Sequence, residues 1–258
     1  MFGQRHCKTA LQDISKLEEN TDLMSKPQDG FVSRFLNRPI SRRITRFLVK
    51  SPIHPNAWTI SIFVLPLIAC VFLVRGDYVS IVIGAAIFQA FSILDGCDGE
   101  IARAKNLESK FGERLDYFSD FVASLLYVLA LGLGLHRSSE GIVCAVLITA
   151  NEVLLRVGKS QTAVAPSTLD ESFYARHRGM IGHSGLLNFG ERFVWWLFQL
   201  TKRDMALVVF LILALLGVAQ WILHLWVTVA GVSLVLSASA LIRAGTARGE
   251  IVTRERRS

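Results

Sequence analysis

Long apolar runs, separated by short polar connections, make up most of the sequence after about residue 50. Each run is close to the roughly 20 residues that a helix needs to cross the hydrocarbon core of a bilayer. His224 and a short polar break are expected to separate the last two runs. The pattern predicts an all-α integral membrane protein with six transmembrane helices, at about 57–75, 77–94, 117–136, 139–156, 204–221 and 222–243.

A basic amphipathic segment precedes the first run. From Leu36 to Leu48, apolar residues recur at helical spacing while arginines occupy the other faces. A helix of this kind lies in the membrane interface, and it can pack on the helix bundle at the same time. Pro52 and Pro55 are expected to end it. The chain therefore divides into a polar N-terminal tail at 1–28, an amphipathic juxtamembrane helix at 29–52, a six-helix domain at 53–245 and a basic C-terminal tail at 246–258.

The distribution of positive charge predicts the orientation of the helices. In the six-helix topology, 26 of the 28 Lys and Arg residues lie on one side, and only Arg75 and Arg137 lie on the other. The positive-inside rule then places both termini in the cytoplasm and the protein in the inner or plasma membrane. The net charge of +7 is explained by this topology and by contact with anionic lipids, so no nucleic-acid partner is expected.

Composition supports the membrane assignment. Hydrophobic residues make up 52% of the chain and charged residues 19%, and the mean hydropathy is +0.42, which excludes an ordinary soluble domain. The first fifty residues are polar and charged, so no cleavable signal peptide is expected. The four cysteines show neither metal-type spacing nor a disulfide framework.

Four aspartates lie where the chain leaves and re-enters the membrane. Asp95 and Asp98 lie on one face of the second predicted helix, and Asp116 and Asp120 lie on one face of the third. The loop at 103–111 lets the two faces oppose each other. One carboxylate at the centre of a bilayer costs roughly 2.5–3.5 kcal/mol, so four together need a compensating partner. A bound divalent cation is the simplest such partner.

The ligand chemistry of the cluster favours a hard metal ion. Carboxylate oxygens suit Mg²⁺, Mn²⁺ or Ca²⁺ better than zinc or copper. Four carboxylates are enough for two ions that clamp a phosphoryl group from both sides. Arg103 has the charge and planar shape to neutralise a pyrophosphate oxygen. Glu100 and Glu113 fall off the aspartate faces and are expected to be solvated.

The same residues carry a resemblance to a known family. The run Asp95-x-x-Asp98-Gly99-x-x-Ala102-Arg103, followed after eight residues by Gly112-x-x-x-Asp116-x-x-x-Asp120, resembles the signature of the CDP-alcohol phosphotransferase (CDP-alcohol phosphatidyltransferase) family. The segment Pro55-Asn56-x-x-Thr59 resembles the family's lead-in to its first spanning helix. The resemblance implies a six-helix membrane enzyme, generally a homodimer, with its active site open to the cytoplasm.

The resemblance also implies a role for each matched residue. Asp120 is the expected general base and also a metal ligand. The expected cofactor is a pair of Mg²⁺ or Mn²⁺ ions, and the expected ligands are Asp95, Asp98, Asp116 and Asp120. The residues expected to bind the nucleotide are Gly99, Ala102, Arg103, Gly112, Asn56 and Thr59.

The substrates are predicted from weaker signals. The segments at 26–34 and 37–41 resemble the membrane domain of di-myo-inositol phosphate phosphate synthases. The expected reaction moves a substituted phosphate from a CDP-alcohol, with CDP-diacylglycerol as the expected donor, to an alcohol such as inositol phosphate, and releases CMP. Candidate residues for a phosphorylated acceptor are Arg156, Lys159 and Arg178, although any cytoplasmic loop would carry such charges.

Two alternatives remain open at this point. The first is a transferase of the same class that uses CDP-inositol and makes a soluble polyol phosphodiester. The second is a non-enzymatic divalent-cation transporter or scaffold. Transporters tend to place carboxylates near the midplane of internally repeated halves, and this sequence shows no visible repeat.

Overall fold

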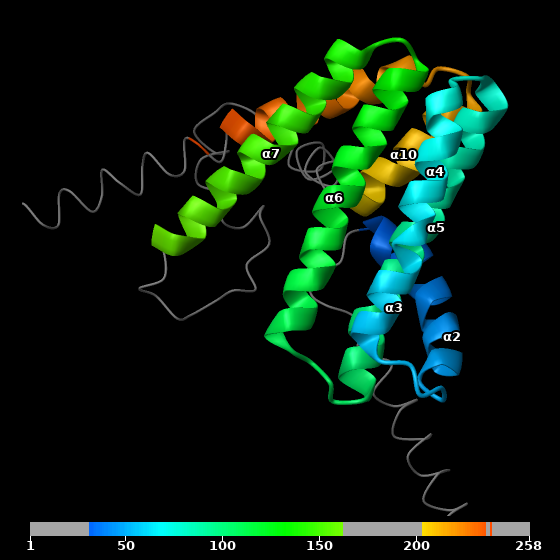
Figure 1. The fold of residues 1–258 in the computed structure, drawn as a ribbon, viewed down its shortest axis with the longest axis vertical. Helices are drawn as coiled ribbons and strands as arrows, with labels where there is room; N and C mark the ends of the chain where they lie inside the picture. Colours follow the sequence, from blue (N-terminus) through cyan, green and yellow to red (C-terminus); the bar gives the residue numbers. More distant parts are fainter. Residues whose placement is uncertain (1–30, 162–202, 236–237, 239–258) are drawn as a thin grey trace, which may run out of the picture.

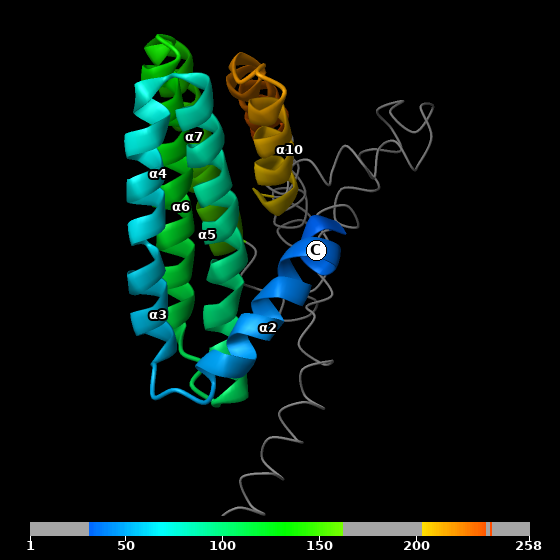
Figure 2. The ribbon, with the colours of Figure 1, turned by 90° about the vertical axis from the view of Figure 1, so that its right-hand side faces the viewer.

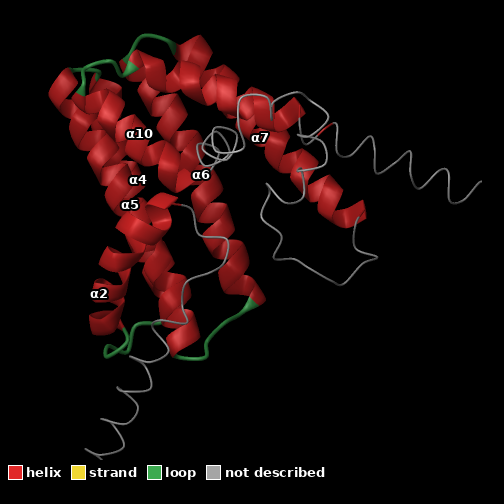
Figure 3. Cartoon of the chain, turned by 180° about the vertical axis from the view of Figure 1, so that it is seen from behind, coloured by secondary structure: helices red, strands yellow, loops and turns green. Residues whose placement is uncertain are grey.

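In the described part of the chain, every regular element is helical (Figures 1 and 3), which confirms the predicted all-α class. The computed structural model describes residues 31–161, 203–235 and 238. The elements are η1 (Ser33–Asn37, a π-helical turn), α2 (Arg38–Leu48), α3 (Pro55–Ile62), α4 (Val64–Arg75), α5 (Tyr78–Ala104), α6 (Lys110–Gly134), α7 (Ser138–Gln161), α10 (Arg203–Leu215) and a last helix at Gln220–Val235.

Three stretches among the described residues are long and apolar enough to cross a membrane. They are Pro55–Arg75, which joins α3 and α4, then Tyr78–Ala104 and Lys110–Gly134. These stretches match the first three predicted spans. Helix α7, α10 and the last helix overlap the other three, and the end of the sixth predicted span lies outside the described residues. The six-span topology therefore stays a prediction.

The last two predicted spans are separated at Gly217 and not at His224, which corrects the expected break. Helix α10 ends at Leu215, and Gly217 has a left-handed φ of 73° that glycine adopts without a steric penalty. His224 lies inside the following helix. Its ring approaches Glu140, with 3.7 Å between Nδ1 and a carboxylate oxygen. A polar residue in an apolar run suggested a break, but His224 stays inside the helix, where it lies near the polar Glu140 of α7.

Helices α4, α5 and α6 lie side by side, and α10 packs against α5 on another side (Figures 1 and 2). An aromatic cluster fills the space between α5, α6, α10 and the last helix. Tyr127 is at its centre, with ring centroids 4.6 Å from Phe88, 5.8 Å from Phe210 and 5.6 Å from Trp226. The contact fixes the distance between the aspartate-bearing helices and α10.

The connection between α5 and α6 reverses the chain in five residues. Asn106 takes a positive φ of 53°, and the Leu107 N–H donates to the Ala102 carbonyl at 2.8 Å, which satisfies the last turn of α5. The Ser109 hydroxyl accepts from the Gly112 N–H at 3.0 Å and caps the start of α6. Helices α5 and α6 thus run in opposite directions with their aspartates facing each other, as the sequence predicts.

Helix α2 packs on α5 through its small polar residues and leaves its apolar residues exposed. Ser41 and Thr45 are buried against α5, whereas Ile40 and Phe47 are exposed. Figure 2 shows α2 lying across the lower part of α5. The expected packing on the bundle is confirmed, while placement in a membrane interface stays a prediction. The helix ends at Leu48, before the prolines that were expected to end it.

Glu100 is fully buried, so the expectation that it is solvated is wrong. Its carboxylate accepts from Arg38 at 3.0 Å, from the Ser41 hydroxyl at 2.8 Å and from the Thr45 hydroxyl at 2.7 Å. All three donors come from α2, which packs on α5, and Arg38 and Ser41 also line a small cavity with Asp95 and Asp98. Glu113 is exposed, as expected.

Candidate active site

Three of the four predicted metal ligands converge. Asp95, Asp98 and Asp116 each place one carboxylate oxygen within 4.8 Å of the other two. Asp95 and Asp98 are buried on α5, and Asp116 faces them from α6. Oxygens that share one Mg²⁺ lie at most about 4.2 Å apart, given metal–oxygen distances near 2.1 Å. A small contraction would therefore let one ion contact all three aspartates.

Helix α3 orients Asp98. The Thr59 hydroxyl donates to Asp98 Oδ2 at 2.6 Å, and the Trp58 indole N–H donates to the Leu94 carbonyl at 3.0 Å. Both bonds join α3 to the part of α5 that carries the aspartates. His54 accepts from the Asn56 N–H at 3.2 Å and caps the start of α3. The lead-in segment thus holds one carboxylate in place.

A cavity of about 500 Å³ opens beside the aspartate cluster, between the starts of α3 and α6 and the end of α5. Glycine keeps part of this space open, because a Cβ on Gly112 would lie 2.9 Å from the Asn56 side-chain oxygen. All six residues predicted to bind the nucleotide line the cavity, together with two of the aspartates: Asn56, Thr59, Gly99, Ala102, Arg103, Gly112, Asp98 and Asp116.

Asp120 stands apart from the other three aspartates and pairs with Arg203. The same guanidinium donates to Asp95 Oδ2 at 2.7 Å. Arg203 is the first residue of α10, so this helix contributes to the site through one side chain that bridges α5 and α6. The other oxygen of Asp95, Oδ1, is buried and has no hydrogen-bond partner among the described residues.

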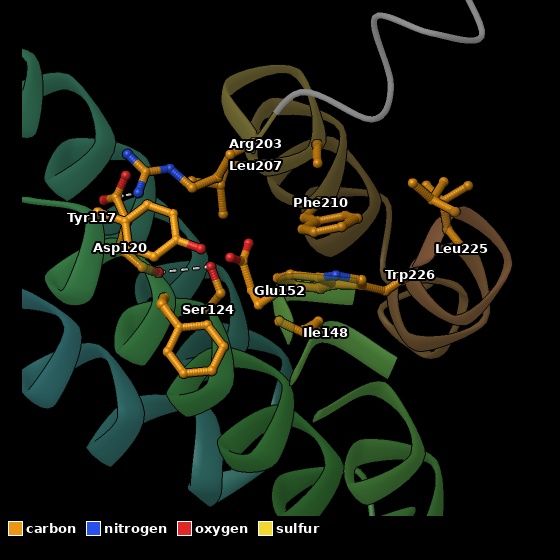
Figure 4. A pocket seen from close by; sticks show the side chains of 13 residues that line it. Tyr117, Asp120, Ser124, Ile148, Glu152, Arg203, Leu207, Phe210, Leu225 and Trp226 are labelled. Atoms are coloured by element: carbon orange, nitrogen blue, oxygen red, sulfur yellow. Dashed lines mark hydrogen bonds and ion pairs between the residues drawn. The ribbon is translucent and has the colours of Figure 1, made fainter. Parts of the chain in front are cut away.

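A second cavity, of about 270 Å³, lies on the other side of Asp120 (Figure 4). Its wall is mostly apolar, with side chains from α6, α7, α10 and the last helix. Figure 4 shows the carboxylate of Glu152 pointing into the space between Ser124 and Phe210, with Trp226 below it. Asp120 lines this pocket, whereas Asp116, one helical turn earlier, lines the cavity of the predicted nucleotide residues.

Only one of the predicted acceptor residues has a described side chain. Arg156 is exposed on α7, and its guanidinium carbon lies 5.2 Å from the ring centroid of Tyr117, which lines the second cavity. The side chain of Lys159 and all of Arg178 lie outside the described residues. The role of these three residues stays a prediction.

Comparison with known families identifies the chain. The family model for CDP-alcohol phosphatidyltransferases matches residues 52–232, which is well over half of the sequence. The chain belongs to the CDP-alcohol phosphatidyltransferase family. It is therefore a transferase, and the alternative of a non-enzymatic transporter or scaffold is set aside. The resemblance stated on the aspartate motif is confirmed.

Several curated proteins resemble this CDP-alcohol phosphatidyltransferase, and they share one description. A "bifunctional IPC transferase and DIPP synthase" from Archaeoglobus fulgidus is 29% identical over 209 residues, which cover 80% of this chain and 37% of the relative. Proteins of the same description from Thermococcus kodakarensis and Aquifex aeolicus are 41% identical over 105 residues and 38% identical over 110 residues. These two matches cover 38% and 43% of this chain, and 23% and 24% of the relatives.

The donor set of this CDP-alcohol phosphatidyltransferase fits a hard divalent cation. Every candidate ligand is a carboxylate, and one buried oxygen of Asp95 has no hydrogen-bond partner in the described part of the chain. A buried carboxylate oxygen without a donor is costly, and a metal ion would satisfy it. The identity of the ion and the number of ions stay predictions.

Sequence reasoning missed Arg203 as a residue of the site. It was counted only among the charges of a cytoplasmic connection, because nothing in the local pattern links it to Asp95, which is 108 positions earlier. The available signal was weak: an Arg-Asp pair stands directly before an apolar run. Glu152 was also missed, although it is an ionisable residue inside a predicted span, which by itself suggests a functional role.

Proposed function

We propose that this protein transfers the phosphoalcohol part of a CDP-alcohol to the hydroxyl of a second alcohol and releases CMP. The observation that carries the proposal is the convergence of Asp95, Asp98 and Asp116 beside a cavity lined by all six predicted nucleotide residues. In this reaction the acceptor oxygen forms a bond to the β-phosphorus. The bond from that phosphorus to the bridging oxygen of CMP breaks, and CMP leaves with the electron pair.

The cavity of about 500 Å³ is the proposed site of the CDP moiety. Gly99, Ala102 and Gly112 leave room for the nucleotide at the helix ends, and Asn56 can hydrogen-bond to it. Arg103 lines the same cavity and is suited to a pyrophosphate oxygen, because guanidinium groups bind phosphates through paired hydrogen bonds. Thr59 acts through Asp98, to which it donates at 2.6 Å.

Asp95, Asp98, Asp116 and Asp120 are the proposed ligands of two Mg²⁺ or Mn²⁺ ions. When bound, two divalent cations would stabilise the charge on both the attacking and the leaving oxygen. The chain's own part is to hold the reacting groups in line and to present carboxylates from two facing helices. Phosphoryl-type transfer needs mainly such positioning and charge stabilisation.

Asp120 is the proposed general base. It lines the pocket of about 270 Å³, which we assign to the acceptor alcohol. A carboxylate can take the proton of a hydroxyl held within about 2.6–3.2 Å, while the same hydroxyl oxygen attacks phosphorus. Ser124 and Glu152 line this pocket and can hydrogen-bond to further hydroxyls of a polyol. Arg156 lies one helical turn beyond Glu152, where a phosphate on the acceptor could reach it.

We propose that the alcohol of the CDP-alcohol donor is a polyol rather than diacylglycerol. CDP-diacylglycerol was the first expectation, but the similar proteins are described as DIPP synthases, which favours the alternative of CDP-inositol and a soluble phosphodiester. We therefore propose CDP-inositol as donor and inositol phosphate as acceptor. CDP-diacylglycerol remains the second candidate because the pocket beside Asp120 is mostly apolar.

A matrix of donors and acceptors tests the proposal. The purified protein is given CDP-inositol or CDP-diacylglycerol with inositol, inositol 1-phosphate or glycerol 3-phosphate, and CMP release is measured with Mg²⁺ and with a chelator. We expect CMP only in the presence of the metal and fastest with CDP-inositol and inositol 1-phosphate. CMP release only from CDP-diacylglycerol would overturn the substrate proposal, and full activity in chelator would overturn the role of the metal.

A further inference from the structure

Arg203 connects the two motif helices at the point where the proposed metal ions would bind. One of its nitrogens donates to Asp95 Oδ2 at 2.7 Å, and the other pairs with Asp120. Its guanidinium also lies 5.9 Å from the ring centroid of Phe91, and the side chain is only 25% exposed. The guanidinium therefore contacts carboxylate oxygens of both α5 and α6. Figure 4 shows its pairing with Asp120 on α6.

The charges around Arg203 explain why a cation is needed there. Asp204 adds to the negative charge, because it lines a small cavity of about 170 Å³ together with Asp95, Asp98 and Asp116. Arg38 and Arg103 line the same cavity and offset part of this charge. Like charges this close repel each other strongly where the effective dielectric constant is low. A positive group between Asp95 and Asp120 reduces this repulsion and keeps α5 and α6 together.

We propose that Arg203 is an internal counter-cation, which neutralises Asp95 and Asp120 until a divalent ion binds there and displaces it. The inference rests on the proposed function, since it concerns the second of the two proposed metal ions. Its consequence is an exchange of partners: when the second ion binds, the guanidinium leaves Asp95 and Asp120, and the two carboxylates face the ion instead.

The test compares metal binding in Arg203→Met with binding in the wild type. Arg203→Met removes the charge and keeps a long apolar side chain. Free Mn²⁺ is measured by electron paramagnetic resonance in a titration without substrate, and the melting temperature is measured in chelator and in saturating Mn²⁺. Arg137→Met is the matched control, because Arg137 pairs with Glu140 at the other end of the bundle.

We expect Arg203→Met to bind the weaker of the two Mn²⁺ ions at least tenfold more tightly than the wild type. Its melting temperature should fall in chelator and recover in Mn²⁺, whereas Arg137→Met should leave Mn²⁺ binding unchanged. If Arg203→Met does not survive in chelator, it is purified in Mn²⁺ and its affinity is measured by competition with a chelator of known affinity.

Two outcomes would overturn the inference, and they differ in what else they affect. Equal or weaker Mn²⁺ affinity in Arg203→Met, with normal Mn²⁺ binding by the wild type, would reject the counter-cation role alone. Failure of the wild type to bind any Mn²⁺ would reject the metal site and with it the proposed function.

Discussion

At the scale of single residues, the surroundings of Asp120 differ from those of the other three aspartates. Asp116, one helical turn earlier, faces Asp95 and Asp98, whereas Asp120 pairs with Arg203 and lines the proposed acceptor pocket. A group that takes the acceptor's proton must reach both the acceptor and the reacting phosphate. Asp120 is our candidate for this group, because it lines the proposed acceptor pocket and lies one helical turn from Asp116.

Replacing Asp120 by Asn should abolish most CMP release. The amide keeps the shape of the side chain but cannot accept the proton, and general-base catalysis typically contributes about 10²–10⁴-fold. The measurement is the initial rate of CMP release with the best substrate pair, together with the elution volume of the protein in detergent. Glu140→Gln, an equivalent change at the far end of the bundle, should keep wild-type turnover. Wild-type turnover by Asp120→Asn would exclude the base role.

Glu100 holds α2 against α5, although it belongs to neither the metal ligands nor the nucleotide residues. Replacing it by Gln removes the charge that Arg38 pairs with and turns one oxygen into an NH2 group. Ser41 and Thr45 donate to different oxygens, so only one of the two hydroxyls keeps its acceptor. We expect the free energy of unfolding to fall by about 2–3 kcal/mol. Breaking a buried ion pair typically costs about 3–5 kcal/mol, and the Gln side chain keeps part of the contacts.

The effect of Glu100→Gln is measured by reversible denaturation in mixed micelles and by trypsin cleavage at the arginines of α2. Docked arginines should be cut slowly in the wild type and faster in the variant. Glu113→Gln is the control, since Glu113 is exposed. Equal stability of the two variants would mean that the Glu100 contacts do not hold α2 in place.

At the scale of helices, the ends of α4 and α6 approach so closely that only glycine fits. A Cβ on Gly134 would overlap the Leu73 carbonyl oxygen, and a Cβ on Gly76 would overlap the Gly134 carbonyl oxygen. Gly76 also has a positive φ of 75°. This contact fixes the far ends of α6 and of the stretch Pro55–Arg75. The near end of α6 carries Asp116 and Asp120, and the near end of the other stretch carries Thr59.

Gly134→Ala should therefore destabilise the bundle by about 1–3 kcal/mol, the usual effect of forcing extra atoms into a packed contact. The obstacle is backbone, which cannot move aside as a flexible side chain would. Gly231→Ala is the matched control, because nothing lies within 4 Å of a Cβ at that position. Unfolding free energies of both variants are compared with the wild type. A Gly134→Ala protein as stable as Gly231→Ala would contradict the close approach.

Helix-level periodicity explains which parts of the site could be predicted. The aspartates on α5 and α6 follow the helical repeat within each helix, so their convergence needs only a short reversing loop. The contacts of Glu100 and Arg203 could not be predicted in this way. Glu100 is bonded by residues of α2, and Arg203 lies on α10, and both helices pack on α5 from distant parts of the sequence. Helical spacing shows that Glu100 leaves the aspartate face, but it does not show that another helix covers the residue.

At the scale of the whole molecule, the two ends of one helix allow the predicted orientation in the membrane to be tested. Helix α6 has 25 residues and is about 37 Å long at 1.5 Å per residue, enough to cross a bilayer. Its start lies near the aspartates and the loop at Lys105–Ser109, and its end lies beside His136 and Arg137. We propose that the aspartate end of α6 faces the cytoplasm. Association of two copies of the chain as a homodimer is a separate proposal, which comes from the family resemblance.

Cysteine labelling tests the proposed orientation. Ser109→Cys and His136→Cys are placed at opposite ends of α6 in a Cys7→Ser background, and intact cells are treated with a membrane-impermeant maleimide. Because positively charged connections stay in the cytoplasm, Ser109→Cys should react only after the membrane is permeabilised, whereas His136→Cys should react at once. The background protein controls for the partly or fully buried Cys70, Cys97 and Cys144. The reverse labelling pattern would place the site outside the cytoplasm, where CDP-alcohol substrates could not be supplied directly.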